Sequence, residues 1–166
     1  MKVVSALLLS VLVVAAAVAA PTAVAATGRL APAPRFLGIL TGAQEVPPVD
    51  SAGWGVVRAR LQGSDLSISF HFAGLGSPVN TSIGLHIHEA PKGANGPILF
   101  PLTENTRLFK GDTAGRGRAR VHLDDAQVTA VRAGTLYLNV HSVEEPAGEL
   151  RAQLWPVGRR RRRRHD

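Results

Sequence analysis

The sequence predicts an all-β fold, an antiparallel sandwich or barrel in a single domain. From Phe36 onward, apolar and polar residues alternate in short runs with a period of two. Gly and Pro separate these runs. Only residues 124–134 read as a helical turn, with Asp124 or Asp125 as N-cap and Gly134 at the end. Short alternating strands joined by tight turns are typical of antiparallel sandwiches and barrels.

The alternating runs define the candidate strands and their core faces. The run 66–72 is the cleanest, with Leu66, Ile68, Phe70 and Phe72 expected inside and the polar residues between them outside. The candidate strands are 36–40, 55–61, 66–72, 83–88, 98–102, 107–109, 117–123, 135–141 and 149–155.

The two ends of the chain differ from this domain. Residues 1–25 have a positive start, a long apolar run and an Ala-Val-Ala cleavage motif, which predict a secretory signal peptide and a secreted, extracellular protein. A Pro/Ala linker, 26–35, precedes the domain at 36–156. No further run is long enough to span a bilayer, so we expect no transmembrane segment in the mature chain.

Most of the net charge of +7 comes from the C-terminus. Without Lys2 and the tail, the chain has nearly equal numbers of basic and acidic residues, so we expect the basicity in the tail and not on the domain surface. A block of like charges stays disordered, as expected for 157–166, and attracts anionic polymers or surfaces. Its arginines are Arg159, Arg160, Arg161, Arg162, Arg163 and Arg164. With no recognition helix and no interleaved aromatics, we expect no specific nucleic-acid binding.

The segment GLHIHEA places two histidines at i and i+2, on one face of a strand. Ile83, Leu85 and Ile87 take the core phase there, so His86 and His88 point away from the core. On neighbouring candidate strands the same polar phase holds Tyr137, Asn139 and His141, and then Glu149, Arg151 and Gln153. If these strands are adjacent, the residues form one polar patch outside the sheet.

Two interpretations of this patch stay open. Three imidazoles from two strands could bind copper or zinc, with Glu89 or Glu149 as a candidate further ligand and Asn139, Glu149 and Arg151 around them. Alternatively, the histidines hold the following loop through hydrogen bonds to its carbonyl groups.

Other chemistry has little support in the sequence. The chain has no cysteine, which excludes disulfides, zinc-thiolate sites and thiol catalysis. The serines lie outside a G-x-S-x-G context, and the Gly-rich segments match neither a phosphate loop nor a dinucleotide fingerprint. Without a complete catalytic set, we expect a non-enzymatic protein.

Within residues 36–155 the chain contains, in this order, the segments LTGAQEVPPVDSAGWG, LHIHEAPKGANGPILFPL and LYLNVHSVEEPAGELRAQL. Together these segments resemble the CHRD domain, a module repeated in chordin and found singly in exported bacterial proteins. Leu85 and Ala152 stand where the family usually has Ala and Gly. The resemblance implies an immunoglobulin-like, Greek-key β-sandwich and no established catalysis.

The histidine segments also resemble those of Cu/Zn superoxide dismutases. GLHIHEA is similar to a segment that supplies two copper ligands there, and AGTLYLNVHS to one that supplies another. This resemblance implies copper ligation by His86, His88 and His141, with Arg151 as counterpart of the active-site arginine. The loop between Glu89 and Gly117 lacks histidine, so the bridging ligand and the zinc site of those enzymes are missing.

These observations leave three hypotheses for the function. The first is a secreted, non-enzymatic CHRD module that binds a protein partner or has a structural role. The second is a copper-binding or weakly dismutase-like protein that uses the three histidines. The third is a binder of polyanions or cell surfaces through the arginine tail.

Overall fold

The computed structural model describes residues 32–158. The predicted signal peptide, most of the linker and the tail arginines lie outside the described residues. The elements are β1 (Arg35–Thr41), η1 (Gly42–Gln44), β2 (Trp54–Gln62), β3 (Asp65–Ala73), β4 (Leu85–Glu89), β5 (Ile98–Pro101), η2 (Thr103–Asn105), β6 (Thr106–Phe109), β7 (Ala114–His122), α1 (Asp125–Ala133), β8 (Leu136–Val140), β9 (Leu150–Gln153) and β10 (Trp155–Pro156).

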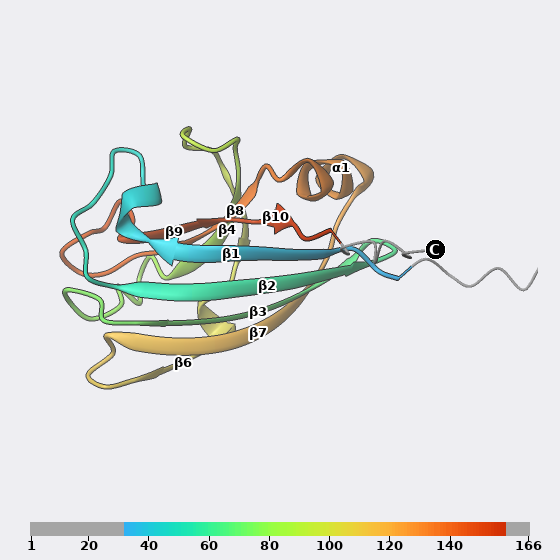
Figure 1. Ribbon diagram of the computed structural model, residues 1–166. Helices are drawn as coiled ribbons and strands as arrows, with labels where there is room; N and C mark the ends of the chain where they lie inside the picture. Colours follow the sequence, from blue (N-terminus) through green and yellow to red (C-terminus); the bar gives the residue numbers. More distant parts are fainter. Residues whose placement is uncertain (1–31, 159–166) are drawn as a thin grey trace, which may run out of the picture. The chain divides into compact units, whose positions relative to one another are not determined.

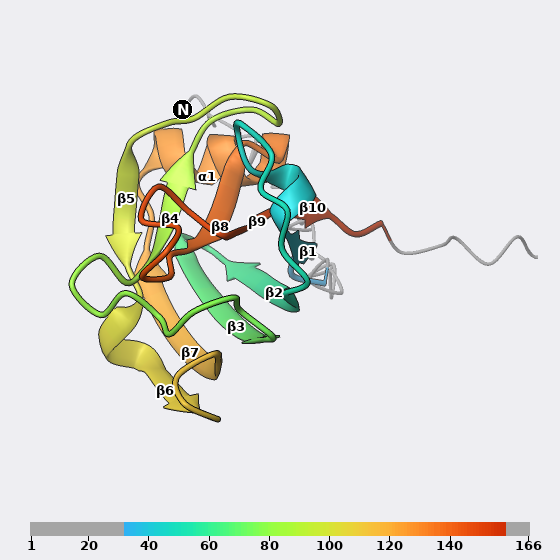
Figure 2. The same cartoon turned by 90° about the vertical axis from the view of Figure 1, so that its left-hand side faces the viewer.

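All strands belong to one antiparallel sheet, in the order β5-β4-β8-β9-β1-β2-β3-β7-β6, with β10 paired to β1. The sheet curls so that a four-stranded half (β5, β4, β8, β9) packs against a five-stranded half (β1, β2, β3, β7, β6) (Figures 1 and 2). The pair Thr41 and Arg151 joins the halves between β1 and β9. The chain crosses between the halves after β3, β5 and β7. The predicted antiparallel β-sandwich is confirmed.

The core lies between the two halves and follows the predicted alternation. On β3, the residues Leu66, Ile68, Phe70 and Phe72 are buried, whereas Ser67, Ser69 and His71 between them are at least partly exposed. The four-stranded half contributes Leu85, Ile87, Leu136, Leu138, Val140, Leu150 and Ala152 to the same apolar cluster. Burial of these side chains is the main stabilising contribution to the fold, because the chain has no disulfide.

The connection from β7 to β8 is the predicted helical turn, α1. Asp124 caps it through a capping box with Gln127, and Gly134 ends it in the left-handed conformation at φ 75°. Among the described residues, none of the helices has the length and apolarity needed to cross a membrane.

One boundary differs from the expectation in a way that concerns the site. Ile83 was expected in the core phase of a strand that starts at that residue, but β4 starts at Leu85. Ile83 instead lies in a turn where its backbone N–H donates to the Asn80 carbonyl, and Gly84 adopts a φ of 87°. Asn80 also accepts the Ile83 and Ser82 N–H groups with its side chain, so local hydrogen bonds take the place of strand pairing.

Candidate metal centre

The strand order brings the three sequence-predicted histidines together. β4 pairs with β8 so that His86 lies opposite Asn139 and His88 lies opposite Tyr137, while His141 follows directly after β8. β8 in turn pairs with β9, which places Arg151 opposite Asn139. The adjacency that the sequence left open is therefore present, and the polar residues share one face of the four-stranded half.

This face is buried, although the sequence predicted a patch outside the sheet. The phase is correct, since the histidines point away from the core residues Leu85 and Ile87. However, His86, His88 and His141 are only 7%, 8% and 5% exposed. Loops cover them, and alternation along a strand contains no information about where loops fold.

The rings of His88 and His141 each have one nitrogen bonded to a loop carbonyl group. His88 Nδ1 lies 3.0 Å from the Gly96 carbonyl oxygen, and His141 Nδ1 lies 3.0 Å from that of Pro146. A carbonyl group can only accept, so each Nδ1 carries the proton and each Nε2 presents a lone pair. The loop-holding role expected in the alternative interpretation is thus real, but it uses only one nitrogen of each ring.

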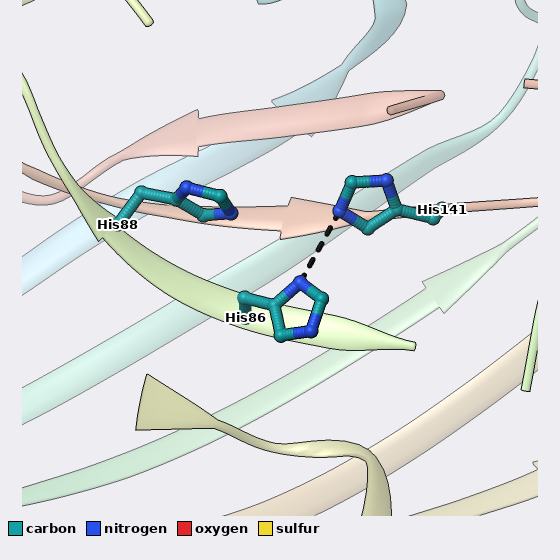
Figure 3. Close-up of side chains that lie close together, drawn as sticks. All are labelled: His86, His88 and His141. Atoms are coloured by element: carbon teal, nitrogen blue, oxygen red, sulfur yellow. Dashed lines mark hydrogen bonds between the residues drawn. The ribbon is translucent and has the colours of Figure 1, made fainter. Parts of the chain in front are cut away.

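One nitrogen of each ring is directed toward the other two rings (Figure 3). His86 Nδ1 lies 3.3 Å from His141 Nε2, and His88 Nε2 is buried with no hydrogen-bond partner in the described structure. Without an ion, a proton on His86 Nδ1 satisfies His141 Nε2 and leaves the lone pair of His88 without a donor. An unpaired buried polar atom is costly, so the lone pair of His88 Nε2 is a candidate ligand for a bound ion.

The environment keeps the three rings neutral near pH 7. Burial lowers the pKa of His141 to about 4, despite its hydrogen bond to Pro146. Burial also lowers the pKa of His88 and of His86, and the neighbouring His88 adds to the effect on His86. Neutral imidazole is the form that binds metal ions, so protons compete weakly at this site.

The candidate ligand atoms of the three histidines all lie within 4.8 Å of one another. Imidazole nitrogens bound to one ion at about 2.0–2.1 Å can be at most about 4.2 Å apart. A pair at the outer limit must therefore approach by several tenths of an ångström, a movement that a small ring rotation provides. The arrangement can chemically hold one transition-metal ion in a three-nitrogen site.

Tyr137 and Arg151 support the ring of His88. Tyr137 stacks on His88 with centroids 4.9 Å apart, and its hydroxyl accepts the Gly96 N–H at 3.2 Å. The Arg151 guanidinium carbon lies 3.6 Å from the centre of the Tyr137 ring, as a cation–π contact. Arg151 also donates to the carbonyls of Pro91 and Ala94 at 3.2 and 2.8 Å, which fixes the covering loop.

A second buried cluster surrounds Asn139. Its Nδ2 lies 3.5 Å from Glu45 Oε2, and both Glu45 Oε1 and Asn139 Oδ1 are buried without a partner in the described residues. Burial raises the pKa of Glu45 to about 7, against the opposing effects of Arg151 and Asn139. Gly148 makes room for this cluster, because a Cβ there would lie 2.6 Å from Asn139 Oδ1.

The candidate carboxylate ligands do not join the histidines. Within residues 32–158, the cluster of possible metal ligands consists of the three histidines alone. Glu149 Oε1 instead accepts from Ser51 Oγ at 2.6 Å and from the Gly76 N–H at 2.8 Å, so it ties two loops together. His122 on β7 lies outside this site, where it is exposed and its Nδ1 lies 3.1 Å from Asp65 Oδ1.

Sequence reasoning missed Glu45 and the full role of Tyr137. Glu45 lies in the segment LTGAQEVPP, and its position among apolar residues and prolines is the sequence feature that could have indicated a buried carboxyl group. Tyr137 was assigned to the correct face, but its contacts with His88 and Gly96 depend on the loop, which the sequence did not place.

Comparison with known proteins gives one family match. The family model described as the CHRD domain matches residues 36–154, which include every described residue of the candidate site. The comparison with curated proteins found no match.

Proposed function

Because the chain belongs to the CHRD domain family, we propose that it is a secreted, non-enzymatic module that binds one copper ion through His86, His88 and His141. Membership of this family supports a non-enzymatic module with no assigned role. The observation that carries copper binding is the unpartnered, buried Nε2 of His88, which faces the ring nitrogens of His86 and His141.

The ligand set favours copper over zinc. Imidazole suits both metals, but a structural zinc site takes four ligands in a tetrahedral arrangement. No carboxylate joins the three histidines among the described residues, and zinc would need water as its fourth ligand. Copper binds more tightly than the other divalent first-row metals to a given nitrogen site.

The burial of the site supports binding over turnover. All three rings are less than a tenth exposed, and carbonyl groups of two separate loops, those of Gly96 and Pro146, bond to His88 and His141. A catalytic metal keeps an open position that substrate can reach. The ion would therefore stabilise the fold and hold the covering loops, in the way that a ligand stabilises any state that binds it.

Copper titration of the purified protein tests this proposal. The wild-type protein is expected to bind one copper ion per chain. The His88→Ala variant should bind at least tenfold more weakly, since it loses one of three ligands. His71→Ala, which removes a histidine from β3 in the other half of the sandwich, is the matched control and should bind as the wild type does. Equal binding by all three proteins would refute the proposal.

A further inference from the structure

The outer face of the five-stranded half is strongly basic. Alternation along β2 points Arg58 and Arg60 away from the core, and β7 does the same with Arg116, Arg118 and Arg120. All five side chains are exposed. Most of the net charge does lie in the tail, but the prediction that the domain surface is not basic is wrong at this face, because a nearly balanced charge count conceals where the charges gather.

The strand register arranges these arginines in two facing rows. β3 runs between β2 and β7, so Ser69 lies between Arg58 and Arg118. Two residues further along, Ser67 lies between Arg60 and Arg120. Strands are about 4.8 Å apart and alternate residues about 6.8 Å apart, which sets two rows of positive charge on either side of a line of serines.

The serines are short and the arginines are long, so the face is hollowed along β3. One groove of about 810 Å³ is lined by both rows and both serines. An adjoining hollow of about 690 Å³ continues past His71 to Arg116. None of the described residues that line the two hollows is acidic. Asp65, at one end, accepts from Arg120 at 2.7 Å.

We propose that this groove, defined by Arg58, Arg60, Arg118 and Arg120 around Ser67 and Ser69, binds a linear anionic polysaccharide. Guanidinium groups form paired hydrogen bonds with sulfate and carboxylate groups. A single extended chain can lie along β3 with charged substituents directed to both rows. The serine hydroxyls on the floor can hydrogen-bond to its sugar hydroxyls. The groove is on the opposite half from the histidines, so this proposal is independent of copper.

Two other polyanions fit the groove less well. Binding of single-stranded nucleic acid without sequence preference uses exposed aromatic platforms for base stacking, but the aromatic residue that lines this groove, Phe36, is buried at 2% exposure. The nearest exposed aromatic residue on β2, Trp54, has its ring edge-on to His71 at the far end. A membrane surface is flat and would contact the arginine tips without filling the hollow.

Measurement of heparin affinity tests the proposal. All variants are made in the full-length protein with every tail arginine replaced by glutamine, so that the tail cannot bind heparin. The groove variant combines Arg58→Gln, Arg60→Gln and Arg118→Gln. The control variant removes three charges elsewhere, through Lys92→Gln, Lys110→Gln and Arg132→Gln. We expect the groove variant to bind heparin at least tenfold more weakly and the control variant to change less than twofold. Neutral dextran should not bind.

A second variant covers the case in which the triple substitution disturbs folding. Ser69→Glu places one negative charge on the floor and should also weaken heparin binding at least fivefold. Equal losses in the groove and control variants would overturn the proposal, because net charge alone would then explain binding. Tighter binding to a 20-nucleotide single-stranded DNA, or to vesicles of phosphatidylserine and phosphatidylcholine, would overturn the assignment to polysaccharide.

Discussion

His88 and Tyr137 lie stacked across the β4–β8 pair, with ring planes only 11° apart. The stack fixes the plane of the imidazole, and the tyrosine hydroxyl holds Gly96, whose carbonyl fixes the tautomer of the same imidazole. One residue thus determines both the orientation and the protonation of the proposed ligand. Partners of this kind typically change metal affinity by about 10–100-fold.

Substitution of Tyr137 is expected to weaken copper binding without removing a ligand. Tyr137→Phe keeps the stack and loses the bond to Gly96, and Tyr137→Leu loses both. We predict that copper affinity falls about threefold in Tyr137→Phe and at least tenfold in Tyr137→Leu, on the scale seen for other residues that support metal ligands. Competition titration with a copper chelator measures both. If Tyr137→Leu bound copper as tightly as Tyr137→Phe, a role for the stack would be contradicted.

Arg151 is expected to hold the covering loop over the site. Lysine keeps the charge but cannot reproduce the bonds to Pro91, Ala94 and Gln153 simultaneously. We predict that Arg151→Lys lowers the free energy of unfolding by about 2–4 kcal/mol, because the buried Gln153 Oε1 and the partly buried carbonyls of Pro91 and Ala94 cannot all keep a charged donor. Copper should also dissociate faster. Arg132→Lys on the exposed side of α1 is the control and should change neither quantity.

Substitution of Gly148 is expected to be destabilising both through backbone strain and through steric overlap, and Gly63 is a control for the strain alone. The φ of Gly148 is 133°, and a Cβ there would also lie 2.9 Å from Glu45 Oε1. Gly63 has a positive φ as well, but open space around it. We predict that Gly63→Ala costs about 1 kcal/mol of strain and Gly148→Ala about 2–4 kcal/mol, from strain and overpacking together. Equal costs in urea unfolding would show that the Asn139 cluster has room to move.

Glu45 is expected to make stability depend on pH. The carboxyl group of Glu45 has an ordinary pKa of 4.5 in the unfolded chain, and burial raises this pKa to about 7 in the folded protein. Between these values the folded state holds the extra proton, so the free energy of unfolding decreases as pH rises. Compared with Glu45→Gln, wild type should lose up to about 3 kcal/mol across this window. A difference that stays constant with pH would contradict the raised pKa.

The sequence predicted the sandwich and the phase of the histidines well, because a period of two follows directly from strand geometry. The sequence was a poorer guide to features that depend on the order of the strands in the sheet or on the positions of loops. The facing arginine rows exist only because β2 and β7 both pair with β3, and those strands are far apart in the sequence. Likewise, alternation assigned Asn139 and Arg151 to the outer face, but their burial depends on loops such as the one that contains Glu45.

Electron paramagnetic resonance of the Cu(II)-loaded protein most directly tests whether the three imidazoles hold copper or only hold loops. Nitrogen couplings count the imidazole ligands. The wild type should show three coupled nitrogens, and His88→Ala should show two, with unchanged strand content by circular dichroism. A wild-type spectrum identical to that of His88→Ala would contradict the three-histidine site, because His88 would then hold only the Gly96 loop.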